Sequence, residues 1–523
     1  MIHLFHRFKN QLKESAVGKN IAASYAAFFS SMMCSLISVP LAVYFLEDPE
    51  IGLWVVLSQV MSYLLWMDIG LASAVGRKMA DAVAVKDAGE INQWWTAATV
   101  ALGTIGCLLI LVGSVISPLL ISAFSLSGQL KADFYWLWFP SLLILGSAFS
   151  LRAVPGLLTA QNRFHWVPIG QTIFPIINLL TFAGLLQCGF GIHAYVGASI
   201  LAHTCNTIYY YFLVKKGPNQ ISWDKAGISR VRFRELFGYS SSFSLIGFME
   251  IFMLGVPSLV IGRITNLAAI PAYNFTSRGP FLTGGLIRRM MQAYYPKMLQ
   301  LHVGGKHQEF RDQVRKTSRL VMGLGIIAAG VALAGNKSFV SLIAGPKFFV
   351  GSFTMLWFSL GIIGSPFMGV TLALLQCGGK IGKSGLVAWI NVSIIVSLSI
   401  LGYNTFGTAG LAAALACYPF PFALYNLVTA SKVCGHSVMD LGGPLLKYGL
   451  VAIISVLSVG FLVAIFPTTS GSLTIYGKSI ILPGTGDWLA GAVMILVGVI
   501  CLTRKEKPCL PAGKADQVLP SCP

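Results

Sequence analysis

Four charged residues lie inside long apolar stretches of this sequence: Asp68, Arg152, Glu250 and Arg278. Nearly every other charge falls in a short polar segment between such stretches. A charge near the centre of a bilayer costs roughly 2.5–3.5 kcal/mol on insertion scales, so such residues face a protein interior or a watery cavity. Guanidinium groups bind phosphate oxygens in a bidentate fashion. The two arginines therefore predict a cavity that handles an anionic group.

The composition is typical of a helical membrane protein. Of 523 residues, 55% are hydrophobic and 11% are charged, whereas soluble domains carry about 25% charged residues. About 20 apolar residues are enough to cross a bilayer as a helix. We therefore expect an all-α polytopic membrane protein with about 14 spans, at residues 20–46, 51–76, 94–121, 134–160, 164–187, 191–214, 237–261, 268–293, 320–343, 349–377, 384–403, 409–431, 445–466 and 486–503.

The basic residues indicate how the chain crosses the membrane. The net charge is +19, with 37 Lys and Arg against 18 Asp and Glu. Cytoplasmic loops of membrane proteins are enriched in Lys and Arg, so this excess does not call for nucleic acid as a partner. With the N-terminus inside, basic segments such as 215–236 and 306–319 all fall on the inner side. We expect a multi-pass protein of the bacterial cytoplasmic membrane with both termini in the cytoplasm.

Features near the membrane surface are predicted as well. Residues 1–19 are basic and carry apolar residues on one helical face, which favours an amphipathic interfacial helix over a cleavable signal. Trp94, Trp95, Trp136 and Trp138 are predicted to anchor helices at the membrane interface.

Two pairs of short segments indicate an internal repeat. The matches pair Ser141–Phe149 with Ser359–Phe367, and Leu71–Met79 with Leu282–Met290. Both matches correspond to a shift of six spans, which keeps the orientation in the membrane and predicts two parallel repeats. Transporters built this way bind substrate between the lobes and alternate access by rocking them.

The repeat divides the chain into three parts. We expect an N-lobe over 1–218, containing the amphipathic N-terminal helix and spans 1–6. A C-lobe over 219–435 contains spans 7–12. Spans 13 and 14 and a cytoplasmic tail occupy 436–523.

Several segments resemble one family of membrane proteins. Glu50-Ile-Gly-Leu-Trp54, Leu65-Trp-Met-Asp-Ile-Gly-Leu-Ala-Ser73 and Arg77-Lys78 resemble the second span of bacterial polysaccharide flippases. Leu259-Val-Ile-Gly-Arg263, Tyr273 and Arg278 resemble the junction of their spans 7 and 8. These flippases belong to the multidrug/oligosaccharidyl-lipid/polysaccharide exporter superfamily.

The resemblance covers the first twelve spans and implies both a fold and a function. The implied fold is a V-shaped pair of helical bundles. The implied function is to move undecaprenyl-diphosphate-linked oligosaccharide, including O-antigen units, from the inner to the outer leaflet by alternating access, for cell-envelope polysaccharide biosynthesis.

One departure from the family concerns ion coupling. Members often carry an acidic residue just before the Leu-Val-Ile-Gly stretch, where this chain has Pro257 and Ser258. Glu250, two helical turns earlier, is the candidate for coupling to H⁺ or Na⁺. Asp68 is a second candidate, and the alternative for it is a pair with an arginine of the other lobe.

Four basic residues are candidate substrate-binding groups: Arg152, Arg278, Arg288 and Arg77. The alternative for Arg278 is a structural ion pair with Glu250. The alternative for Arg152 is a side chain that extends to the lipid headgroups. Arg77 and Arg288 occupy matching span ends, where anchoring at the cytoplasmic interface is the simpler interpretation.

The sequence contains no pattern typical of an enzyme or a metal site. The ten cysteines are scattered without a C-x-x-C or His/Cys cluster, so we expect no metal and no cofactor. No nucleophile and base with a large outer loop are present, which disfavours a membrane-embedded polymerase or ligase. The remaining alternatives are a cation-drug antiporter and a peptidoglycan-precursor flippase of the same superfamily.

Overall fold

A computed structural model describes residues 16–65, 75–76, 78–79, 81–83, 87–161, 163–217, 221–238, 241–378, 383–465, 472–475, 478–481 and 485–503. The helices of the first half are α2 (Ala16–Phe45), α3 (Asp48–Leu65), α5 (Ala88–Ala123), α6 (Gly128–Leu151), α7 (Ala153–Ala160), α8 (Trp166–Gln187) and α9 (Ala194–Lys215). Short helical turns are η2 (Gly191–His193), η3 (Lys225–Gly227), η4 (Leu267–Ala269) and η5 (Pro346–Phe348).

The second half continues the helical pattern. Its elements are α10 (Arg230–Gly238), α11 (Ser241–Ile264), α12 (Ile270–Val303), α13 (His307–Ile343), α14 (Ser352–Cys377), α15 (Ser384–Cys417), α16 (Pro419–Cys434), α17 (Val438–Ile465) and α18 (Thr485–Thr503). Between α17 and α18, β1 (Ser472–Ile475) and β2 (Lys478–Ile481) form an antiparallel hairpin, with Ser472 opposite Ile481.

The expected polytopic helical fold is confirmed. Among the described residues, nine helical segments are long and apolar enough to cross a membrane. One of them, Ser384–Cys434, contains two predicted spans, which are separated by Gly407 at φ 60° in the left-handed region. The predicted spans outside these nine segments coincide with α3, α9, α12 and α18.

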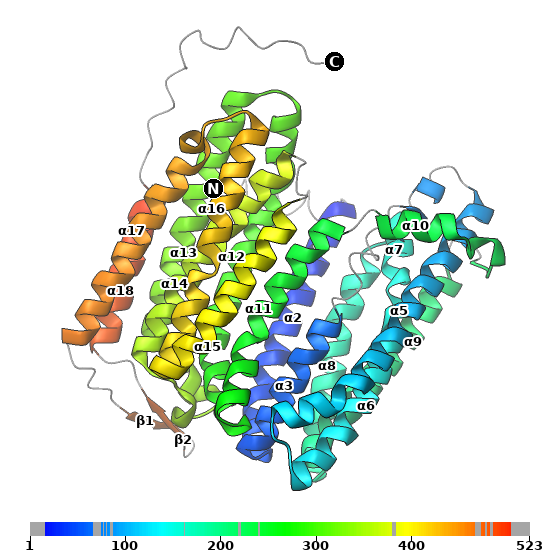
Figure 1. Ribbon diagram of the computed structural model, residues 1–523, viewed down its shortest axis with the longest axis horizontal. Coiled ribbons are helices and arrows are strands. Elements are labelled where there is room, and N and C mark those ends of the chain that lie inside the picture. Colours follow the sequence, from blue (N-terminus) through cyan, green and yellow to red (C-terminus); the bar gives the residue numbers. More distant parts are fainter. Residues whose placement is uncertain are drawn as a thin grey trace.

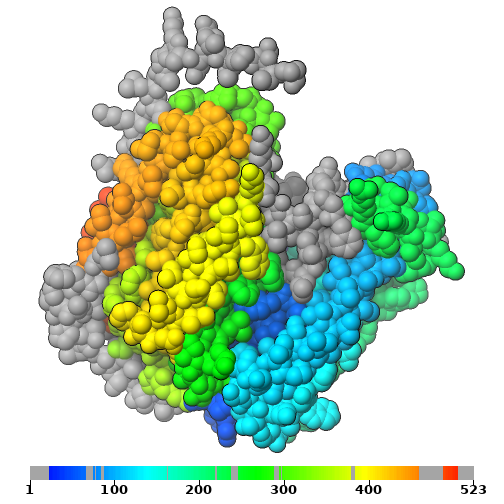
Figure 2. Space-filling model, in the orientation of Figure 1, coloured from blue at the N-terminus to red at the C-terminus, as the bar shows by residue number. Residues whose placement is uncertain are grey.

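Two bundles of helices form a V (Figure 1). The N-lobe contains α2 to α9, and the C-lobe contains α11 to α16 with α17 and α18 packed on its outer side. The lobes converge at the end where α5 turns into α6 and diverge at the end near α10. Figure 2 shows the resulting notch between the cyan and yellow helices. With the predicted topology, the divergent end is cytoplasmic and the structure corresponds to an inward-opening state.

The linker between the lobes lies on the N-lobe. The predicted boundary at residue 218 assigns α10 to the C-lobe, but α10 and η3 pack on α5. Asp224 N–H donates to Thr96 Oγ1 at 3.0 Å, and the Cα of Gly227 is so close to Gln93 that an added Cβ would lie 2.3 Å from its carbonyl oxygen. The linker therefore packs against the N-lobe.

The predicted interfacial role of two tryptophans is wrong. Trp138 is fully buried, and its indole N–H donates to the carbonyl of Gly113 at 3.0 Å. Trp94 is buried beneath the guanidinium of Arg232, 4.8 Å from its ring centroid. Trp136 is 69% exposed, as an interfacial residue would be. A contact between two helices therefore buries Trp138, and the sequence pattern alone does not reveal it.

Close contacts hold the lobes together at the convergent end. Gly52 on α3 lies against Leu267 of η4, where an added Cβ would be 2.1 Å from the Leu267 carbonyl oxygen. Lys347 Nζ lies 2.8 Å from Asp48 Oδ2 across the same boundary. Deeper in the membrane, Tyr63 donates to the Phe252 carbonyl at 3.0 Å. These contacts close the predicted outer side.

We expect Gly52→Ala to weaken this closure, because the new methyl group overlaps backbone atoms of the other lobe. Overpacking of this kind costs about 1–3 kcal/mol, which a lower midpoint of thermal unfolding in detergent would report. Gly184→Ala is the matched control, since nothing lies within 4 Å of a Cβ at that helical position. Equal melting of the two variants would contradict the role assigned to Gly52.

Candidate functional site

The N-lobe contains a cavity of about 650 Å³ that reaches Arg152. Arg152 stands at the break between α6 and α7. Pro155 follows within one turn and lacks the N–H that would bond the carbonyl four residues earlier, which explains the break at this point. The guanidinium lies 4.7 Å from the centroid of the Phe149 ring. Among the described residues that line the cavity, Arg152 is the one with a permanent charge.

Polar side chains face the cavity at helical spacing. They comprise Ser31, Ser35 and Ser38 of α2, Gln171 and Asn178 of α8, and His203 and Asn206 of α9. The spacings of three, four and seven residues place each set on one face of its helix. Another face of α8 exposes Ile173, Ile176 and Leu180. The polar faces therefore turn inward and the apolar faces turn to lipid, since unpaired polar groups in hydrocarbon are costly.

Aromatic residues close the outer end of the cavity. The Trp54 ring stacks on Phe182 with centroids 6.1 Å apart and an interplanar angle of 28°, and it meets Tyr195 edge-on at 6.3 Å. The indole N–H of Trp54 is buried and has no hydrogen-bond partner within the described part of the chain. A buried donor without a partner costs about 1–3 kcal/mol, so a ligand acceptor at this position would stabilise it.

Arg278 connects the C-lobe to this cavity. It lies on α12, and its guanidinium donates to Ser35 Oγ on α2. Ser35 itself lines the N-lobe cavity. Arg278 is half-buried, in agreement with its expected position deep in a span. Arg278 thus contacts a residue of the cavity wall, but it is not itself among the lining residues.

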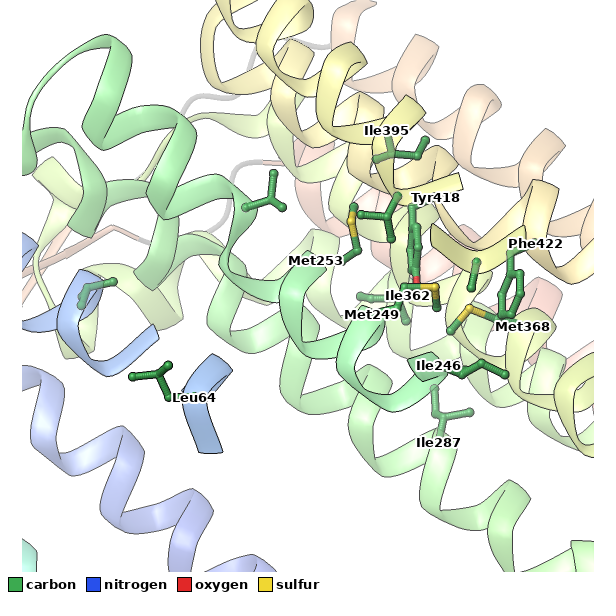
Figure 3. Close-up of a cluster of buried hydrophobic side chains, with 14 of the residues drawn as sticks. Leu64, Ile246, Met249, Met253, Ile287, Ile362, Met368, Ile395, Tyr418 and Phe422 are labelled. Carbon is green, nitrogen blue, oxygen red and sulfur yellow. The ribbon is translucent and has the colours of Figure 1, made fainter. Parts of the chain in front are cut away.

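The C-lobe encloses a second cavity, of about 530 Å³, which Glu250 lines. Its wall is largely apolar and includes Met253, Ile362 and Met368, which Figure 3 shows converging from α11 and α14. Tyr418, between α15 and α16, completes this side. Among the described lining residues, the N-lobe cavity therefore carries a guanidinium and the C-lobe cavity a carboxylate.

Three of the charged residues that the sequence singled out are not described by the structure. Asp68, Arg77 and the side chain of Arg288 lie outside the described residues. Lys78, the neighbour of Arg77, forms an ion pair with Glu235 of α10 at 2.5 Å and lies over the Trp94 ring. Lys78 is therefore engaged in holding the linker to the N-lobe.

The histidines of the sixth predicted span have partners. His203 Nε2 lies 2.9 Å from Ser147 Oγ, and His193 Nε2 lies 3.6 Å from the buried Asp133 carboxylate. No group of three His, Cys, Asp or Glu side chains suited to a metal ion occurs among the residues that the structure describes.

Sequence reasoning from charge missed most of the cavity. Gln171, Asn178 and Asn206 are neutral, so a search for buried charges passes over them. The signal that would have found them is the spacing of polar residues within apolar spans, seven residues apart on α8 and three apart on α9. Such a stripe inside a span predicts an interior face as firmly as a charge does.

We expect the Arg278–Ser35 hydrogen bond to couple the lobes energetically. Bonds to a charged group contribute about 1.5–3 kcal/mol, so Ser35→Ala and Arg278→Met should each lower thermal stability. Their combined effect should fall short of the sum by at least about 1 kcal/mol in a double-mutant cycle. Ser35→Ala combined with Lys347→Met is the control pair and should be additive. Additivity in both pairs would contradict the coupling.

Comparison with known proteins supports a family and a fold. Residues 45–349 match the model of a family described as "polysaccharide biosynthesis protein", which is more than half of the chain. No curated protein sequence gives a significant match.

Solved transporter structures share the fold. An inward-facing multidrug resistance MATE family transporter of the MOP superfamily superposes with a TM-score of 0.63 at 13% identity, covering 79% of this chain and 99% of that one. A mutant of the Vibrio cholerae MATE transporter VcmN gives 0.60 at 14%, covering 81% and 98%. The lipid II flippase MurJ in an inward closed conformation gives 0.60 at 15%, covering 92% and 98%.

Proposed function

The chain belongs to the polysaccharide biosynthesis protein family, and on that premise we propose that it flips undecaprenyl-diphosphate-linked oligosaccharide. The transfer would run from the inner to the outer leaflet of the bacterial cytoplasmic membrane, by alternating access. The observation that supports this most directly is Arg152, a guanidinium on the wall of a cavity that also carries several neutral polar side chains, within a two-lobed membrane fold. Such a cavity suits a diphosphate, which guanidinium binds in a bidentate fashion.

A flippase of this kind must carry a polar headgroup through the hydrocarbon interior of the membrane. A sugar headgroup cannot enter hydrocarbon without losing its hydrogen bonds to water, so it needs a polar route. The polyprenyl chain needs none and can remain in lipid. The notch between the lobes opens toward the predicted cytoplasmic side, where the substrate is loaded.

Release on the other side requires the contacts at the convergent end to break. The Lys347–Asp48 ion pair and the Gly52–Leu267 contact hold that end closed. The exposed ion pair contributes little, typically about 0.2–1 kcal/mol, which suits an interface that must open in each cycle. Arg278 would then exchange Ser35 for a phosphate oxygen as the lobes rock.

Glu250 is the proposed coupling residue. It lines the C-lobe cavity, and its carboxylate offers oxygen atoms to a proton or Na⁺. Asp68 stays a second candidate from the sequence. Glu250 also favours a second function, a cation-drug antiporter, because a carboxylate in an apolar cavity suits an organic cation. The fold is shared with multidrug transporters and a lipid II flippase, so a peptidoglycan precursor is a further candidate substrate.

The test measures the rate of flipping in proteoliposomes. The substrate is the undecaprenyl-diphosphate-linked glycan purified from the protein's host. We expect Arg152→Ala and Arg278→Ala to reduce the rate at least about tenfold, because each removes a charged partner of the diphosphate. The lysine variants should restore part of it. Lys215→Ala is the basic control; this residue lies at the end of α9 beside Tyr211 and should flip normally.

Two further transport assays distinguish the proposed function from its alternatives. Lipid II tests the peptidoglycan-precursor hypothesis, and an organic cation such as ethidium tests the antiporter hypothesis. A folded wild-type protein that exports ethidium and moves no lipid-linked glycan would overturn the proposal.

A further inference from the structure

The N-lobe cavity is elongated along the membrane normal. Tyr195 and Tyr210 of α9 both line it and are separated by roughly 22 Å along the helix axis at 1.5 Å per residue. Two hydrogen bonds show which residues of α6 and α8 lie at the same depth as residues of α9. His203 meets Ser147 at 2.9 Å, and Tyr209 donates to the Trp166 carbonyl at 2.7 Å.

From these two bonds, the lining residues can be ordered by their depth in the cavity. Arg152, one and a half turns beyond Ser147, lies near the level of Asn206 at the inner end. Gln171 and His203 follow, and Asn178 lies deeper. Trp54 marks the outer end, where it stacks on Phe182. A cation therefore stands at one end of the cavity and an aromatic surface at the other.

The groups between these ends suit carbohydrate. Gln171, Asn178 and Asn206 carry carboxamides, and each carboxamide offers both donors and an acceptor. Sugar hydroxyls need both, whereas a hydrocarbon chain needs neither. The aromatic face of Trp54 suits the C–H face of a pyranose ring, and its partnerless N–H suits a hydroxyl oxygen. A volume of about 650 Å³ lies within the range that ligand pockets occupy, ~300–1,000 Å³.

We infer that the N-lobe cavity holds the glycan of the transported lipid, with its diphosphate end at Arg152 and its sugars extending toward Trp54. This inference rests on the proposed function and adds the location and orientation of the headgroup within one lobe. Fewer side chains of the C-lobe cavity offer hydrogen bonds to hydroxyl groups, and the charged residue among its described lining is a carboxylate, Glu250. The polyprenyl chain leaves the cavity at the Arg152 end.

Photo-cross-linking tests the location in the intact protein. p-Benzoylphenylalanine replaces Phe174, which lines the N-lobe cavity, or Phe281, which lines the C-lobe cavity and is the matched control. Each protein is irradiated with the host's undecaprenyl-diphosphate-linked glycan in proteoliposomes. Mild acid then cleaves the bond between sugar and diphosphate, and mass spectrometry identifies what stays on the protein.

The expected adduct at position 174 retains saccharide mass after acid, and position 281 retains none. A polyprenyl phosphate adduct at position 174, or saccharide at position 281, would overturn the inference. So would the absence of any adduct at position 174 in a protein that still flips the glycan. A protein that flips no glycan at all contradicts the proposed function instead, so the two failures are distinguishable.

A binding measurement checks the orientation. Asn178→Leu removes the carboxamide at nearly constant size and should weaken binding of the host glycan-lipid about tenfold. Binding of sugar-free undecaprenyl diphosphate should stay within about twofold, since that ligand ends near Arg152. Arg152→Gln should weaken both probes. Equal loss of both probes in Asn178→Leu would contradict the assigned orientation.

Discussion

The cost of an unpaired polar group in hydrocarbon governs this structure. Every polar side chain in a span must find a partner or an aqueous cavity. The helix α8 illustrates the consequence, because it exposes Ile173, Ile176 and Leu180 and turns Gln171 and Asn178 inward. The same constraint acts on α2 and α9, whose polar faces meet those of α8. A polar cavity inside the N-lobe therefore follows from the faces of three helices.

Small residues and helix breaks make that enclosure possible. Pro155 interrupts the fourth span beside Arg152, and Gly156 then packs against Gly76, where an added Cβ would lie 3.1 Å from its amide nitrogen. Gly52 performs a similar role between the lobes, since the backbone of Leu267 occupies the place of its Cβ. The convergent end closes through such contacts, while α10, at the divergent end, packs on α5 of the N-lobe.

The parts of the fold that depend on local chemistry were predictable from the sequence. Long apolar runs located the spans, and deep charges identified Arg152 and Glu250 as cavity residues, because a buried charge has few other solutions. What depends on the packing of distant segments was not predictable. Trp138 is buried where α6 packs on α5, with its indole N–H bonded to the carbonyl of Gly113. The bond between Arg278 and Ser35 joins residues 243 positions apart, and no local pattern encodes such a pair.

The internal repeat indicates whether the fold itself requires an arginine at position 152. The repeat predicts Val370 as its counterpart, and Val370 is fully buried in the continuous helix α14. The shared scaffold thus accepts an apolar residue at this position, so the fold does not require a guanidinium there. This difference between the lobes, together with the neutral polar residues around Arg152, supports the proposal that a ligand enters the N-lobe cavity.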